Sequence, residues 1–82
     1  MEEFYHEWTW EPREFTWFKG HSLNGMGVYK DFEHDTFWQY NVVVNGELVV
    51  MGEGKFATAE EAQREAEKEF QKRKTENEKT GN

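Results

Sequence analysis

The stretch from Thr36 to Phe70 decides the fold of this chain; it reads TFWQYNVVVNGELVVMGEGKFATAEEAQREAEKEF. Asn45-Gly46 is the dipeptide that best tolerates the two positive-φ positions of a type I′ turn, and β-branched and aromatic residues flank it on both sides. The stretch therefore predicts a β-hairpin. Further along, Thr58 and Glu61 have the spacing of a capping box, which predicts that a helix begins there.

A two-residue loop fixes the register of this hairpin, and the register decides which side chains face the core. In the simplest register Val42 lies opposite Val49, and Tyr40 lies opposite Met51. We therefore expect the core face to carry Trp38, Tyr40, Val42, Val44, Val49 and Met51. The second face then carries Phe37, Gln39, Asn41, Val43, Leu48 and Val50.

The predicted helix has a stripe of small residues on one side. Ala59, Ala62 and Ala66 recur at spacings of three and four residues, and Phe70 continues the stripe. Small side chains allow a close approach to a sheet. From about residue 74 the chain has no apolar residue, so we expect residues 74–82 to be a disordered tail.

The N-terminal half predicts additional strands. Residues 4–10 alternate, which indicates an aromatic strand or arm within residues 1–12, and residues 15–18 and 26–32 predict two further strands. Asn24-Gly25 between them is expected to be a second positive-φ pair. The fold class is thus α+β, with an antiparallel meander sheet of three to five strands and one C-terminal helix packed on one face, as a single domain over residues 1–73.

Composition limits the kinds of function that fit. The chain has 82 residues, no cysteine and 17% aromatic residues, so we expect an aromatic core, no disulfide and no thiolate metal site. No apolar run reaches the length of a membrane span or signal peptide, which favours a soluble cytoplasmic protein without a membrane partner.

The formal charge is −7 and lies mostly before the helix. Residues 1–56 hold ten acids and four bases, whereas residues 57–82 hold seven and six. An acidic field repels phosphate and attracts basic surfaces, so a basic protein is a better partner than nucleic acid. The alternative interpretation is that the acids only keep a small aromatic-rich protein in solution.

Covering one sheet face with the helix leaves the apolar second face to be explained. Exposed apolar patches of this kind usually mark an interface. Three arrangements account for it: the strand carrying Trp8 and Trp10 folds over it, two copies pair through it as a homodimer, or a partner binds there. We expect the first.

No pattern of catalytic or ligand residues emerges. His6, His21 and His34 are far apart and lack a second ligand at helical spacing, Ser22 is the only serine and lies in a predicted turn, and no carboxylate pair is singled out. We expect no enzyme, no metal site and no cofactor.

The run from Tyr40 to Glu67 resembles the second half of a double-stranded RNA-binding domain, with strand, turn, strand and alanine-striped helix in order. The order of Gly27-Val28-Tyr29, Trp38, Gly54 and the capping box is also similar to the DNA-binding domains of plant ethylene-response factors. These resemblances imply an architecture of antiparallel strands followed by a helix. At the start of the last helix, where the RNA-binding family carries phosphate-binding lysines, this chain has Ala57, Ala59, Glu60 and Glu61.

In size, acidity, aromatic content and plan the chain is similar to small phage and prophage anti-defence proteins, such as anti-CRISPR inhibitors. That resemblance implies an inhibitor that occupies a basic surface of a nucleic-acid-processing complex as a DNA mimic in the cytoplasm of a host cell. The partner-binding residues we expect are Asp31, Glu33, Asp35, Glu47 and Glu53, with Phe37, Val43 and Leu48 as an apolar anchor. The alternatives are a nucleic-acid-binding module and a dimeric sponge for a nucleotide-like ligand.

Overall fold

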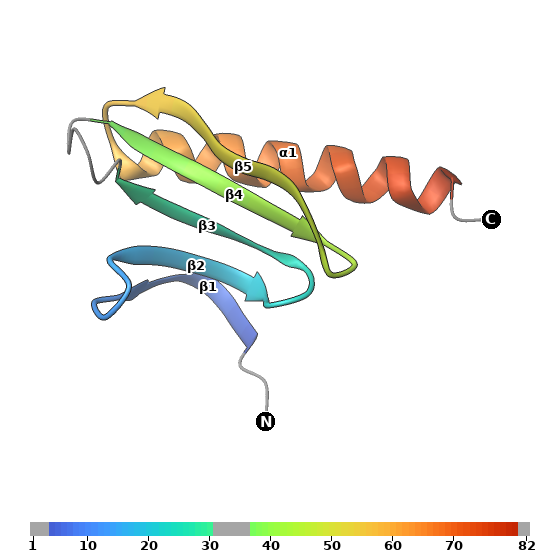
Figure 1. Ribbon diagram of the computed structural model, residues 1–82, viewed down its shortest axis with the longest axis horizontal. Helices are drawn as coiled ribbons and strands as arrows, with labels where there is room; N and C mark the ends of the chain where they lie inside the picture. Colours follow the sequence, from blue (N-terminus) through green and yellow to red (C-terminus); the bar gives the residue numbers. More distant parts are fainter. Residues whose placement is uncertain (1–3, 31–36, 81–82) are drawn as a thin grey trace.

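The computed structural model describes residues 4–30 and 37–80, with side chains as far as residue 76. Its strands are β1 (Phe4–Glu11), β2 (Thr16–His21), β3 (Gly25–Lys30), β4 (Trp38–Val44) and β5 (Glu47–Phe56), and its helix is α1 (Ala59–Thr80). The strands form one antiparallel sheet in the order β1-β2-β3-β4-β5. The predicted fold class, an α+β meander with one packed helix, is therefore confirmed (Figure 1).

The helix covers only part of the sheet. It packs on β3, β4 and β5, and Figure 1 shows β1 and β2 lying to one side of it. The alanine stripe faces the strands as predicted, because Ala62 and Ala66 are fully buried. Thr58 Oγ1 accepts a hydrogen bond from the backbone N–H of Glu61 at 3.2 Å, which confirms Thr58 as the helix cap, and the Glu61 carboxylate reaches back to the Thr58 hydroxyl.

The centre of the core is aliphatic, contrary to the expected aromatic core. Its buried residues are Met26, Val28, Tyr40, Val42, Val44, Val50, Ala62 and Ala66. Tyr40 is the only ring among them, and tryptophans and phenylalanines surround this centre half-buried. Alanines bring the helix so close to β3 and β4 that valine fills the space between them.

The turn at Asn45-Gly46 has φ values of 51° and 78°, which confirms the predicted positive-φ pair. The prediction of a second positive-φ pair at Asn24-Gly25 is wrong, because neither residue has positive φ. His21 and Asn24 instead exchange backbone hydrogen bonds of 2.9 and 3.1 Å. The two turns touch, since Gly46 N–H donates to the carbonyl of Leu23 at 2.8 Å. This contact gives the β2–β3 turn a partner that sequence spacing does not reveal.

Residues of β4 face the core as predicted, but of the two predicted in β5 only Val49 packs against the core cluster, where it is half-buried. Val42 pairs with Val50 instead of Val49, Tyr40 pairs with Glu53, and Met51 is 72% exposed. β5 has ten residues and β4 has seven, and the register shifts at three places along the pair. Each bulge moves one residue out of alternation, so Val50 enters the core and Met51 leaves it.

The strand that carries Trp8 and Trp10 does not fold over the second face. β1 is an edge strand of the same sheet, and Trp10 lies opposite Trp17 on the side of the helix. Trp8 packs against the core cluster from that side. The face opposite α1, which we call the open face, is therefore covered by no element of the described chain.

The helix continues to Thr80, so residues 74–80 belong to it where composition predicts a disordered tail. Lysine and glutamate are good helix formers, and a helix can continue past its last apolar residue without core contacts. Arg73 Nε bonds the Glu69 carboxylate at 2.9 Å, and Lys74 Nζ lies 5.9 Å from the Phe70 ring. No helix of the described ranges combines the length and apolarity needed to cross a membrane.

Candidate functional site

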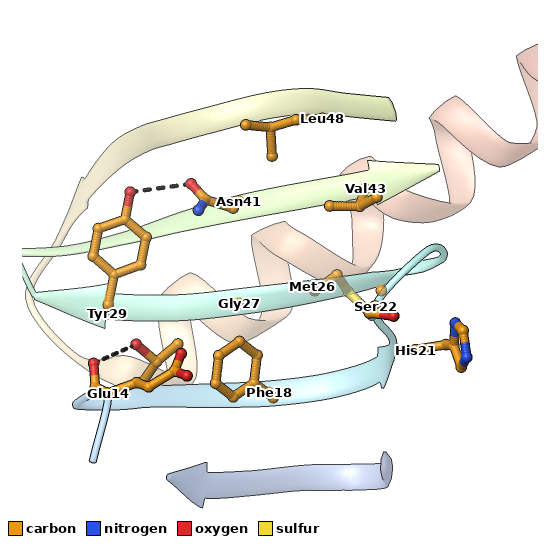
Figure 2. Close-up of a pocket in the computed structure, with 12 residues that line it drawn as sticks. Glu14, Phe18, His21, Ser22, Met26, Gly27, Tyr29, Asn41, Val43 and Leu48 are labelled. Atoms are coloured by element: carbon orange, nitrogen blue, oxygen red, sulfur yellow. Dashed lines mark hydrogen bonds between the residues drawn. The ribbon is translucent and has the colours of Figure 1, made fainter. Parts of the chain in front are cut away.

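The open face contains a groove whose floor is bare backbone. Gly25 and Gly27 alternate on β3 and present no side chain there. Phe18 on β2 lies opposite Gly27, and Asn41 on β4 lies opposite it from the other side. Figure 2 shows Phe18, Gly27 and Asn41 in one row across three strands, with Leu48 beyond them on β5. The hollow, which we call the open-face groove, has a volume of about 360 Å³.

One wall of the open-face groove is apolar. Val43 lies directly opposite Leu48 in the β4–β5 ladder, and Leu48 is 47% exposed. Phe18 forms the facing wall and stacks on Tyr5 of the edge strand, with ring centroids 6.2 Å apart and planes 19° apart. Because Gly27 separates these walls, an apolar side chain or a flat ring fits between them.

A small polar cluster closes one end of the groove. The Asn41 Oδ1 atom accepts hydrogen bonds from the Tyr29 hydroxyl at 3.0 Å and from the Gly52 N–H at 2.7 Å. Beside it, Thr16 is buried and its hydroxyl donates to the carbonyl of Glu14 at 2.8 Å. Each of these hydrogen bonds has its partner within the chain, so the groups shape the groove more than they offer free ligands.

Serine, histidine and glutamate side chains also line the groove. Ser22 and His21 both line it, but His21 Nδ1 accepts the backbone N–H of Leu23 at 3.1 Å within their turn. The glutamate that lines it, Glu14, stands alone among the described lining residues. Among residues 4–30 and 37–80, no three histidines or carboxylates gather as a metal site would require.

The structure brings together part of the predicted partner-binding set. Val43 and Leu48 adjoin on the open face, as the apolar anchor requires. Glu47 and Glu53 pair with Val44 and Tyr40, whose side chains are in the core, so both acids lie on the helix side of β5, where they are exposed. Phe37 is 40% exposed. Asp31, Glu33 and Asp35 lie outside the described residues.

Sequence reasoning missed Phe18, Gly27 and Tyr29 as members of the groove. A signal for them exists, because two glycines at alternate positions of a strand pattern indicate a close backbone approach or a ligand. The Asn24-Gly25 pair has the composition of a turn, and this obscures the alternation of Gly25 with Gly27. Placing Phe18 beside them requires the β2–β3 register, which depends on the turn at His21 and Asn24.

The surroundings of Tyr40 shift the pKa of its hydroxyl upward. Burial in the core raises the pKa of its hydroxyl, and the carboxylates of Glu69, Glu65 and Glu53 raise it further. Its hydroxyl thus remains neutral at physiological pH. It lies on the helix side and takes no part in the groove.

Compared with known proteins, the chain matches no family model, no curated protein and no solved structure. Its function is therefore argued from its own geometry and charge.

Proposed function

We propose that this chain is a small non-enzymatic binding protein that docks on a basic protein surface through its open face. The observation that carries the proposal is the open-face groove, an uncovered hollow with a glycine floor between Phe18 and the Val43–Leu48 pair. Interface energy concentrates in a few desolvated contacts, and a groove of this kind accepts one protruding apolar side chain. The partner supplies that side chain.

Charge supports a basic partner. Glu11 and Glu14 lie at one end of the open face, in and beside the β1–β2 turn. The sequence between β3 and β4 adds Asp31, Glu33 and Asp35. Acidic side chains accelerate and orient encounter with a basic surface more than they add affinity. The resemblance to phage inhibitors suggests a bacterial nucleic-acid-processing complex as the class of partner.

The test compares two single changes on β5. Leu48→Asp places a charge in the groove wall, whereas Met51→Asp places the same charge on a residue that is 72% exposed and outside the groove. Tagged wild-type protein and both variants are used as bait in a nuclease-treated bacterial lysate, with mass spectrometry as the readout. We expect wild type and Met51→Asp to recover one basic partner in stoichiometric amount, and Leu48→Asp to lose it.

Equal recovery by all three baits would contradict docking through the open face. Recovery of nothing by folded wild-type protein would contradict a protein partner in that lysate. Far-ultraviolet circular dichroism of each bait shows whether the variants keep their fold.

A second candidate function is binding of a flat small molecule, such as a nucleotide base, in the same groove. The volume of about 360 Å³ lies within the range of ligand sites, and Phe18 offers a stacking surface over the glycine floor. A ligand that binds only the folded state raises the melting temperature. A panel of nucleotides that leaves the melting temperature unchanged at millimolar concentration would rule this function out.

A further inference from the structure

Three tryptophans converge on the helix side of the sheet, at the end where α1 begins. Trp10 of β1, Trp17 of β2 and Trp38 of β4 line an open hollow together with residues 57–60. All three rings are half-buried, because the helix packs on β3, β4 and β5 and leaves β1 and β2 beside it (Figure 1). We call this site the tryptophan hollow. It lies on the opposite side of the sheet from the open-face groove.

The rings form walls instead of one stack. The centroids of Trp10 and Trp17 are 5.4 Å apart and their planes are tilted by 55°. The Phe15 ring meets Trp10 edge-on at 5.6 Å, although Phe15 is 65% exposed and has a φ of 53°, a left-handed conformation that is rare for a bulky residue. Three aromatic side chains are therefore held together at the surface without being buried.

One of these rings, that of Trp38, already contacts a cation within the chain. Lys30 Nζ lies 5.5 Å from the centroid of the Trp38 ring, within the distance of a cation–π contact. Glu60 lines the hollow and Glu61 follows it in the first turn of α1. Their two negative charges exceed the partial positive charge of a helix N-terminus, which is about half a unit charge. The ring faces and the carboxylates both favour a cation over an anion.

We propose that the tryptophan hollow binds an arginine side chain of a partner protein. A guanidinium is planar, stacks on indole rings and is weakly hydrated, whereas a lysine ammonium is compact and strongly hydrated. Glu60 at the edge of the hollow supplies the opposite charge. The inference does not depend on the open-face groove, since the two sites lie on opposite sides of the sheet and each can fail alone.

The test is a titration of isotope-labelled protein with a blocked Gly-Gly-Arg-Gly-Gly peptide, followed by NMR of the indole N–H groups. The control peptide carries citrulline, which has the shape of arginine without its charge. Trp8 serves as an internal control, because its indole N–H is buried and lies outside the hollow. We expect the arginine peptide to shift Trp10, Trp17 and Trp38 but not Trp8, and to bind about two- to fivefold more tightly than the citrulline peptide.

Two variants sharpen the result. Lys30→Gln removes the cation that occupies Trp38, so the arginine peptide should bind more tightly, whereas Glu60→Gln should weaken binding. Amide spectra show that each variant is folded. Equal binding of the two peptides, shifts that avoid the three indoles, or absence of any shift at millimolar peptide would overturn the proposal. These outcomes leave the open-face proposal standing, because the lysate experiment tests that one separately.

Discussion

Gly25 and Gly27 occupy neighbouring open-face positions of β3 but differ in the space around them. A Cβ atom built on Gly27 would lie 3.5 Å from the Phe18 ring and from the Thr16 methyl group, which is ordinary contact distance. A Cβ on Gly25 would lie 2.6 Å from the carbonyl of His21 and 2.7 Å from that of Lys19. Gly25 is thus required by the fold, and Gly27 only keeps the groove open.

Alanine at each position separates stability from binding. Gly27→Ala should keep or raise the free energy of unfolding, because glycine inside a strand costs about 0.5–1 kcal/mol relative to alanine, yet it should weaken partner binding by filling the floor. Gly25→Ala should lower stability by about 1–3 kcal/mol through overpacking against backbone. Urea unfolding and capture of the partner measure the two effects. Unchanged capture by Gly27→Ala would show that the floor of the groove is not used.

The raised pKa of Tyr40 predicts how the stability of the protein depends on pH. Burial first, and then Glu69 and Glu65, raise its pKa above the ordinary value of 10.0. Above pH 10 the unfolded chain releases the tyrosine proton while the folded chain keeps it, so this contribution to stability is complete below pH 10 and is lost as pH rises through the folded pKa. Tyr40→Phe should show a shallower alkaline fall in the free energy of unfolding than wild type.

The matched control for that experiment is Tyr5→Phe, on the edge strand and outside the core. It should retain the alkaline fall of wild type. Equal slopes for wild type and Tyr40→Phe would show that the alkaline loss comes from groups other than Tyr40.

Among the elements, β5 owes its path to contacts with other strands. Gly52 and Gly54 have φ values of 63° and 95°, a region in which side chains are strained, and they accommodate bulges that lengthen β5 against β4. The Asn41 side chain holds the first of these glycines through its 2.7 Å hydrogen bond to the backbone N–H of Gly52. The bulge is therefore fixed from β4.

Replacing that side chain should loosen the bulge. Asn41→Val removes the oxygen that accepts hydrogen bonds from the Gly52 N–H and from the Tyr29 hydroxyl. We therefore expect the free energy of unfolding, measured in urea, to fall by about 1–3 kcal/mol. Gln39→Val, two residues earlier on the same face, is the control and should change stability by less than about 0.5 kcal/mol. Similar losses in both variants would point to the strand as a whole instead of the bulge.

The helix makes its own prediction, through the alanine stripe. Ala66 is fully buried against the sheet, so Ala66→Leu should destabilise the protein by about 1–3 kcal/mol, since the extra methyl groups force α1 away from the strands. Gln71→Leu, at an exposed position of the same helix, should have little effect. Thermal unfolding distinguishes the two, and a stable Ala66→Leu variant would show that the helix can shift on the sheet.

For the molecule as a whole, much of the excess negative charge comes from two short segments. Residues 1–3 hold Glu2 and Glu3, residues 31–36 hold Asp31, Glu33 and Asp35, and neither segment holds a lysine or an arginine. In the sequence, residues 31–36 connect β3 to β4.

Reversing charge in that segment tests its part in binding. Glu33→Lys with Asp35→Lys should slow association with the basic partner and reduce the dependence of its rate on salt, while dissociation changes less. Stopped-flow or surface-based kinetics at low and high ionic strength measure this. Unchanged association would remove the acidic segment from the interface and leave the apolar groove as the source of recognition.

What the sequence by itself determined is local. The Asn45-Gly46 turn, the Thr58 cap and the alanine stripe each depend on residues within a few positions of one another, so backbone geometry and spacing suffice to predict them. Together they implied an antiparallel meander with one packed helix, which is the fold observed. They also placed Val43 and Leu48 on the uncovered face.

What only the tertiary structure decided depends on contacts between strands. Val50 entered the core and Met51 left it because bulges held by Asn41 change the alternation of β5. The groove depends on Gly27 lying beside Phe18. The turn at His21 and Asn24, three residues from each of them, sets the register that pairs them. The tryptophans gathered beside the helix because the described helix covers three strands of five. Periodicity says which residues share a face of one strand, but the partner strands and the helix decide which face is buried.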